Sequence, residues 1–180
     1  MSVMSSIPPG ALLRQRFSDA VDAPGSPRIL QLLLAQDGST TRLCESVAGG
    51  PIALHLLHQV ITTDVPDVVR DALPGERFIE RITCIAAHGE VMMDNLSYVA
   101  LEGLAPDLLR DLEAGRMPIG HLLTRMWVRR AALPPSDSLQ DRLWRTVGLA
   151  DAKATRNYRI DTPDGPCMLI CETYRGGMLM

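Results

Sequence analysis

Several common signals are missing from this chain of 180 residues. It has no basic run, its net charge is −3, and its aromatic residues (4%) are scattered rather than interleaved with arginines, so nothing predicts nucleic-acid binding. No apolar run approaches the length that a bilayer crossing needs. The first twenty residues lack the continuous apolar core of a signal peptide. We therefore expect a cytoplasmic protein with no membrane insertion.

The cysteines also lack a chemical pattern. Cys44, Cys84, Cys167 and Cys171 show no CxxC spacing, and each falls within a predicted helix or strand. Disulfides and a zinc site remain alternatives, but buried free thiols are the interpretation we favour for a cytoplasmic protein. No Gly-rich phosphate loop is present either. The sequence thus predicts no metal and no cofactor.

Length and composition predict one folded domain. A chain of 180 residues, 46% of them hydrophobic, is long enough to bury about 70% of its unfolded surface. Residues 1–27 are rich in Ser, Pro and Gly, and we expect a flexible N-terminal lead-in with one short helix around Ala11–Ala20. Residues 28–180 then form the single domain.

The segment Glu76–Ala100 is predicted to be a long β-hairpin with its turn at His88-Gly89-Glu90. Alternation along the first strand separates two faces that are both largely apolar. One face carries Ile79, Arg81, Thr83 and Ile85, and the other carries Phe78, Glu80, Ile82 and Cys84. We therefore expect this strand to be central and covered on both sides.

Arg81 is unusual in such a strand. A guanidinium between two isoleucines costs several kcal/mol to desolvate unless an anion or a carboxylate meets it. One interpretation is an arginine at a strand end whose charge reaches water. The other is an anion-binding arginine inside a pocket.

The remaining pattern predicts five further helices and four further strands. Pro27 fits the first turn of a helix whose ILQLLLAQ run is apolar enough to be buried. Ser39-Thr40 is expected to cap the next helix, which ends at Gly49-Gly50. In the strand that follows Pro51, His55 and His58 are predicted to lie on opposite faces and to be structural. The other predicted elements are helices at Pro66–Leu73, Leu104–Gly115 and Ser136–Thr146, a corner at residues 116–123, and strands at residues 126–133, Thr155–Asp161 and Cys167–Arg175. Six strands, mostly linked by hairpins, indicate an α+β fold with an antiparallel sheet.

Two further residues stand out as candidate functional groups. Gly120, at the start of a helical turn, would let backbone approach a ligand and offer an amide to an anion, or it simply forms a helix–helix corner. Glu172 shares a strand face with Met168, Ile170 and Tyr174. A carboxyl in such an apolar row suits a general acid or base, or it forms a structural pair with Arg81 across the sheet.

Taken together, these segments resemble the chorismate pyruvate-lyase family. The similarity runs from about Ile29 to Tyr174, and its order and spacing carry it more than any single motif. Its landmarks are LLLAQDGSTTRL, the arginine within ERFIERI, the PIG-HLL corner and the ETY near the C-terminus. The resemblance implies a six-stranded antiparallel sheet with helices on one side and a ligand enclosed beneath helical flaps.

The resemblance also assigns roles to residues. The carboxylate-binding arginine falls on Arg81, the backbone amide contact on Ile119 and Gly120, and the catalytic glutamate on Glu172, with Arg81 assisting catalysis. We add Ser39 to the substrate-binding set. The resemblance implies elimination of pyruvate from chorismate to give 4-hydroxybenzoate, driven by aromatisation and needing no cofactor.

This chain departs from the family at two places. Leu96 stands where the ubiquinone-pathway enzymes carry a second arginine, and their Gly-Arg-Arg tract after the late tryptophan is absent. Arg156 and Arg129 are candidates to replace that charge. The main interpretation is a chorismate lyase that serves ubiquinone synthesis or a secondary-metabolite pathway. These departures leave two alternatives open beside it. One is a divergent lyase for a related aromatic acid, and the other is a non-catalytic, effector-type domain like those of GntR-type regulators. The residues before Pro27 are too few for the DNA-binding winged helix of such regulators.

Overall fold

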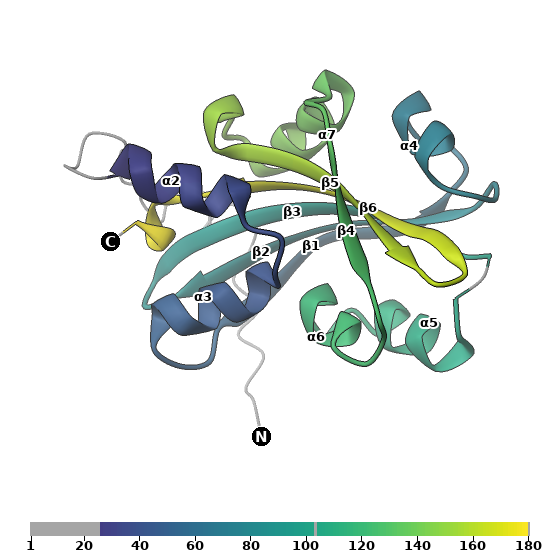
Figure 1. The fold of residues 1–180 in the computed structure, drawn as a ribbon, viewed down its shortest axis with the longest axis horizontal. Helices are drawn as coiled ribbons and strands as arrows, with labels where there is room; N and C mark the ends of the chain where they lie inside the picture. Colours follow the sequence, from purple (N-terminus) through teal and green to yellow (C-terminus); the bar gives the residue numbers. More distant parts are fainter. Residues whose placement is uncertain (1–25, 103, 180) are drawn as a thin grey trace.

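The computed structural model describes residues 26–102 and 104–179 and contains one six-stranded antiparallel sheet (Figure 1). The strand order is β1-β2-β3-β6-β5-β4. The strands are β1 (Ala53–Thr62), β2 (Phe78–Ala87), β3 (Glu90–Ala100), β4 (Arg129–Leu133), β5 (Thr155–Thr162) and β6 (Gly165–Tyr174). This confirms the predicted α+β class with its six antiparallel strands.

Six helices connect the strands and precede them. They are α2 (Ser26–Ala35), α3 (Thr40–Ala48), α4 (Asp67–Ala72), α5 (Pro106–Glu113), α6 (Ile119–Leu123) and α7 (Asp137–Val147). Two short 3₁₀ turns, η2 (Ala152–Ala154) and η3 (Gly176–Met178), complete the described elements. The predicted lead-in and its short helix around Ala11–Ala20 fall outside the described residues.

The β2–β3 hairpin forms where the sequence predicted it. Its turn residues His88 and Gly89 both have positive φ angles, 53° and 81°, as the tight turn between paired Ala87 and Glu90 requires. Every residue of β2 except the last is buried, so the prediction of a strand covered on both sides is confirmed.

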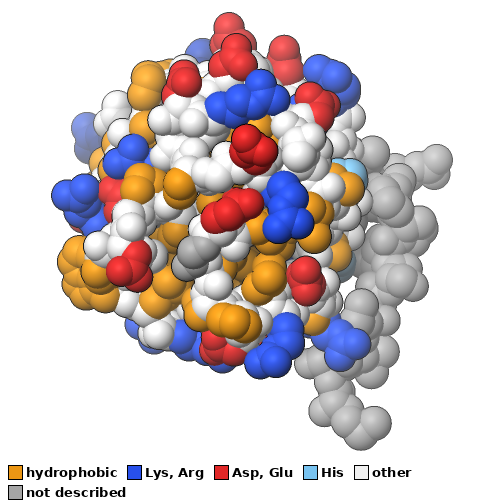
Figure 2. Space-filling view, turned by 90° about the vertical axis from the view of Figure 1, so that its right-hand side faces the viewer, with side chains coloured by type: hydrophobic (Ala, Val, Ile, Leu, Met, Phe, Trp, Pro, Cys, Tyr) orange, Lys and Arg blue, Asp and Glu red, His pale blue; other side chains and the backbone are white. Residues whose placement is uncertain are grey.

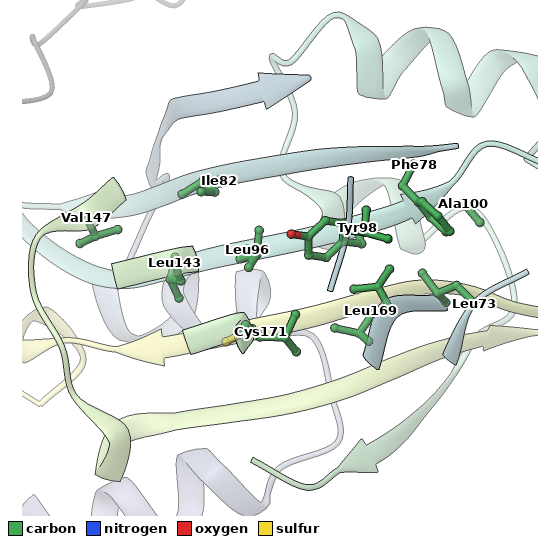
Figure 3. Close-up of a cluster of buried hydrophobic side chains, with 13 residues drawn as sticks. Leu73, Phe78, Ile82, Leu96, Tyr98, Ala100, Leu143, Val147, Leu169 and Cys171 are labelled. Carbon is green, nitrogen blue, oxygen red and sulfur yellow. The ribbon is translucent and has the colours of Figure 1, made fainter. Parts of the chain in front are cut away.

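One face of the sheet, here called the α7 face, packs against α4 and α7. On α7, Leu139, Leu143 and Val147 are spaced four residues apart and form one buried stripe. Figure 3 shows Leu143 and Val147 beside strand residues such as Ile82 and Leu96. Burial of each such side chain contributes about 1.5–3 kcal/mol.

The opposite face carries Arg81 and is here called the Arg81 face. Beneath α5 and α6 it packs Leu112 and Leu122 against strand residues such as Ile170, and beneath α2 and α3 it packs Leu33 and Cys44. The helices therefore cover both faces (Figure 1), and the expectation of helices on one side is corrected. The physical reason is the double apolar alternation of the central strands, which leaves neither face able to remain in water.

Two local predictions are also wrong. Helix α2 is not buried: Leu32 is 72% exposed, and Leu33 is its one buried residue among those whose side chains are described. His55 and His58 do not lie on opposite faces. The register of β1 shifts at Leu57, and this extra residue places both histidines on the α7 face, with His55 opposite Cys84 and His58 opposite Ile82.

No helix within residues 26–102 or 104–179 has the length and apolarity that a membrane crossing requires. On the face seen in Figure 2, basic and acidic side chains are interspersed, and no field of one sign covers it.

Candidate functional site

The Arg81 face holds a small internal cavity, here called the central cavity. It has a volume of about 40 Å³ and lies between the sheet and the first turns of α3 and α6. Its polar lining consists of Thr40, Thr41, Thr83, Asn95, Arg130, Tyr158 and Glu172. Small-molecule sites usually measure about 300–1,000 Å³, so this cavity is too small to hold such a ligand without widening.

Glu172 lies at the wall of the central cavity and is 1% exposed. Alternation in β6 and pairing with β5 bring it opposite Arg156. Arg156 donates to Glu172 Oε1 from Nε (2.7 Å) and Nη2 (2.6 Å). Burial alone would lower the pKa of Arg156, but the Glu172 carboxylate raises it above its ordinary value. The expected Arg81–Glu172 pair is therefore replaced by an Arg156–Glu172 pair.

Three hydroxyl groups surround the same carboxylate. Thr40 donates to Oε1 (2.9 Å) and Tyr158 donates to Oε2 (3.0 Å), while the Tyr174 hydroxyl lies 3.2 Å from Oε1 and 3.0 Å from the Leu33 carbonyl. Burial, and then the charge of Glu172, raise the pKa of both tyrosines, so both remain protonated donors. The protein itself thus engages both oxygens of Glu172.

Arg81 is buried in the middle of β2, with 1% of its surface exposed. Its Nη2 donates to the carbonyls of Gly115 (3.2 Å) and Met117 (2.9 Å), in the segment that joins α5 to α6. Its Nε and Nη1 have no partner among the described residues. Burial lowers the pKa of Arg81 to about 10, which still leaves it charged at neutral pH. The strand-end interpretation is therefore wrong.

Arg81 and Glu172 share a face but lie in different rows of the sheet. Arg81 is opposite Ser97 of β3, whereas Glu172 is opposite Asn95. Arg81 is not part of the cavity lining, although its neighbour Thr83 and Met117's neighbour Pro118 are. The arginine therefore lies beyond one end of the central cavity, covered by the segment between α5 and α6.

Ile119 and Gly120 begin helix α6 and both line the central cavity. As the first two helical residues, their amides have no intrahelical acceptor. Gly120 is also required by packing: a Cβ there would lie 2.2 Å from Thr41 Oγ1 and 3.0 Å from Ser39 Oγ. The helix–helix corner and the ligand-facing position are thus the same place.

Ser39 is the N-cap of α3, and its Oγ accepts a hydrogen bond from the Arg42 amide (3.4 Å). The capping prediction is confirmed. Ser39 does not line the central cavity, and its neighbours Thr40 and Thr41 do. Its assignment as a substrate-binding residue stays a prediction.

Helices α3 and α6 are joined by a polar contact above the cavity. His121 Nε2 lies 2.9 Å from Glu45 Oε1, and both side chains are about one-third exposed (38% and 34%). Together with the close approach of Gly120 to Thr41, this pair holds the first turns of α3 and α6 against each other. A ligand larger than the central cavity would have to widen the space between these helices and the sheet.

The structure corrects the search for a replacement cation. Leu96 is fully buried on the α7 face, so its position does not point toward the cavity. Arg129 pairs with Asp161 at 3.0 Å and leaves most of its side chain in water. Its neighbour Arg130, which sequence reasoning missed, lines the central cavity instead. Once β4, β5 and β6 are known to pair, the alternation of side chains along β4 and β5 places Arg130 and Tyr158 on the same face as Glu172. This is the signal that could have identified them.

The described residues contain no group of three or more His, Cys, Asp or Glu side chains that could hold a metal ion. The four cysteines are free and buried. Burial raises the pKa of Cys44 and Cys171 to about 12, so these thiols are poor nucleophiles.

Comparison with known proteins identifies the fold. No family model and no curated protein matches the sequence. Among solved structures, PhnF from Mycobacterium smegmatis is 14% identical, with 81% of this chain and 67% of that chain covered and a TM-score of 0.52. The C-terminal domain of the histidine utilization repressor from Pseudomonas syringae pv. tomato str. DC3000 is 12% identical (71% and 94% covered, TM-score 0.48). A GntR-family transcriptional regulator from Bacillus cereus is 10% identical (69% and 92% covered, TM-score 0.43). At these identities the likeness shows the fold alone, which is the chorismate lyase-like fold found in GntR-family regulators.

Proposed function

We propose that this chain is a binding domain for a small aromatic carboxylate, with 4-hydroxybenzoate as the representative ligand. The observation that carries the proposal is the buried guanidinium of Arg81, two of whose nitrogens have no partner among the described residues. A buried charge without full hydrogen bonding costs several kcal/mol. A ligand carboxylate that reaches Nε and Nη1 would remove that cost.

The surroundings of Arg81 suit the rest of such a ligand. Gln59 lies opposite Arg81 on β1, and its Oε1 is likewise buried without a partner. The amides of Ile119 and Gly120 offer further donors at the start of α6. The wall between Arg81 and Glu172 includes Ile170, which provides an apolar surface for a ring.

The occupied state of Glu172 favours binding over turnover. Both of its oxygens already accept hydrogen bonds from Arg156, Thr40 and Tyr158, which leaves little capacity to exchange a proton with a substrate. The fold shared with regulator proteins agrees with a binding role. Because the central cavity is smaller than such a ligand, uptake would require α3 and α6 to move away from the sheet.

Chorismate lyase activity is a second candidate, and one arrangement favours it. Glu172 and Tyr158 line the central cavity on the same face that carries Arg81. In this reaction the enolpyruvyl C–O bond breaks, a ring proton is lost, and the products are 4-hydroxybenzoate and pyruvate. Glu172 would act as the acid/base and Arg81 would hold the ring carboxylate.

Calorimetry with 4-hydroxybenzoate tests the binding proposal. Arg81→Met should weaken binding by about 2–5 kcal/mol, the cost of removing one partner of a buried charged pair. Arg77→Met is the matched control, because Arg77 lies four residues earlier on the same segment with its side chain 64% exposed, and it should bind as the wild type does. Equal affinity in the Arg81 variant and the wild type would overturn the proposal.

A turnover assay separates the two candidates. Wild-type protein that binds 4-hydroxybenzoate but releases no pyruvate from chorismate is a binding domain. If pyruvate is released, Glu172→Gln should reduce turnover by about 10²–10⁴-fold while retaining product binding. Unfolding of the same variant must be measured in parallel, because the change leaves Arg156 without its counter-charge.

A further inference from the structure

A second and larger cavity lies at the edge of the sheet, between the C-terminal end of α2 and strands β4 and β5. This α2 groove has a volume of about 330 Å³ and is open on one side. That volume falls within the range of sites for small molecules. None of the residues assigned to substrate binding or catalysis from the sequence lines it, although Arg156, named there only as a candidate replacement cation, does.

The walls of the α2 groove are mainly apolar. Leu34 and Ala35 contribute from α2, and Ala132, Leu133 and Pro135 contribute from β4 and the residues after it. Such walls suit the hydrocarbon part of a ligand. They do not explain why two arginines also line the groove.

Arg130 is the arginine of the groove that lacks a counter-charge. Its Nη1 reaches only the Asp37 carbonyl at 3.3 Å, and its buried Nε has no partner among the described residues. The second arginine, Arg156, is neutralised by Glu172. The one acidic residue of the lining, Asp37, is exposed, and its side chain forms no ion pair with Arg130 in the described structure. Arg130 therefore supplies a positive charge available to a ligand.

Asn157 adds a second unmet polar group. It is 4% exposed, it lines the α2 groove, and its Nδ2 donates to the Pro134 carbonyl at 3.1 Å. Its Oδ1 is buried and has no partner in the part of the chain described. Buried amide oxygens are nearly always hydrogen-bonded. This oxygen can accept only from a donor, so the charge of Arg130 is the feature of the groove that selects an acid.

We propose that the α2 groove binds a small carboxylic acid with an apolar body, whose carboxylate pairs with Arg130. The site is separate from the Arg81 end of the central cavity and does not depend on the function proposed for it. The two cavities share Arg130 and Tyr158 as common lining. An acid in the groove would therefore lie next to the residues that surround Glu172.

Amide NMR titration of the full chain with benzoate tests this site. Benzoate should shift the amides of residues 34–37 and those of Ala132 and Leu133. Arg130→Met should raise the Kd that these shifts give for benzoate by about tenfold or more, as expected for loss of one charged hydrogen bond. Arg129→Met is the matched control, because the adjacent Arg129 is exposed, pairs with Asp161, and does not line the groove. Unchanged groove shifts in the Arg130 variant would overturn the proposal.

Two further arms make the test specific. Ala132→Phe fills the groove from an exposed position that does not line the central cavity, and it should abolish the groove shifts without unfolding the protein. Arg81→Met should leave them unchanged, and their loss in that variant would overturn the claim of a separate site. Inorganic phosphate should bind the groove more weakly than benzoate. Equal or tighter phosphate binding would overturn the assignment to an apolar-bodied acid.

Discussion

The buried charges on the two faces of the sheet differ in how fully they are paired. On the α7 face, Glu80 accepts from Tyr98 (2.7 Å) and Arg142 (2.8 Å), and Asp94 pairs with Arg175 at 2.6 Å. On the Arg81 face, Glu172 is met by Arg156, but Arg81 has two nitrogens without partners among the described residues. Glu80, Asp94 and Arg81 are all at most 4% exposed, so burial alone does not explain the difference.

The location of unmet polar atoms sharpens this contrast. Among the described residues, five buried side-chain atoms have no partner, and four of them belong to Arg81, Gln59 and Arg130 on the Arg81 face. The fifth is Oδ1 of Asn157, which lies opposite Cys171 on the α7 side of β5 and also lines the α2 groove. Most of the unmet polar atoms therefore lie on the Arg81 face, whereas Glu80 and Asp94 on the α7 face have their partners.

Breaking a pair on the α7 face should produce the largest effect. Asp94→Ala removes the carboxylate that Arg175 Nε contacts inside the protein, and we expect a loss of about 3–5 kcal/mol in the free energy of unfolding. Urea denaturation measures it. Asp107→Ala, at an exposed position on α5, is the control and should change stability by less than about 0.5 kcal/mol. A loss below about 1 kcal/mol for Asp94→Ala would remove the distinction between the faces.

Alkaline pH should produce an intermediate effect through the buried thiols. Burial, and then the charge of Glu172, raise the pKa of Cys171 from 9.0 to about 12. The folded protein keeps this proton while the unfolded chain loses it, so stability is complete below pH 9 and falls as pH rises toward 12. The slope is about 1.4 kcal/mol per pH unit for each such thiol.

Cys171→Ala should therefore reduce the loss of stability between pH 9 and pH 11, measured by urea denaturation at each pH. The thiols on the two sides should behave alike, because burial raises the pKa of Cys44 to about 12 as well. An identical pH slope in the variant and the wild type would contradict the burial of the thiol. Equal pH dependence for the thiols on the two faces would show that the faces exclude water equally and differ in their charged groups.

The smallest effect on stability is expected at Arg81. Arg81→Met removes a desolvated cation and loses its two carbonyl contacts, and these changes oppose each other. We expect the ligand-free protein to unfold within about 1 kcal/mol of the wild type. Thermal and urea unfolding would check this. A loss as large as that of Asp94→Ala would make Arg81 a structural residue and would count against its role in binding.

Much of the fold followed from the sequence because its determinants are local. The alternation around Arg81 predicted the buried strand, and His88-Gly89 predicted the hairpin turn. The same alternation predicted that both faces of the sheet would be covered, and this was correct. The family resemblance had instead implied helices on one face only. The irregularity at Leu57 could not be predicted, because an extra residue in a strand leaves no mark in an apolar pattern.

The candidate site was less predictable, because partners across a sheet depend on strand order and register. Glu172 and Arg81 lie on the same face, as alternation indicated, but the register places Arg156 rather than Arg81 beside the carboxylate. Helix α2 looked buried by composition, yet its place at the edge of the molecule leaves Leu32 in water. Cavities arise from several elements together and have no signature in any one of them.

The contact between α3 and α6 has a kinetic consequence. The central cavity, at about 40 Å³, is smaller than the aromatic acid proposed here, so α3 and α6 would have to separate before such a ligand fits. Apparent affinity would then be the intrinsic affinity multiplied by the fraction of molecules in the wider form. Association should reach a plateau at the rate of opening as ligand concentration rises, and release should wait for the same event. A weak equilibrium constant in this domain can therefore coexist with a long residence time.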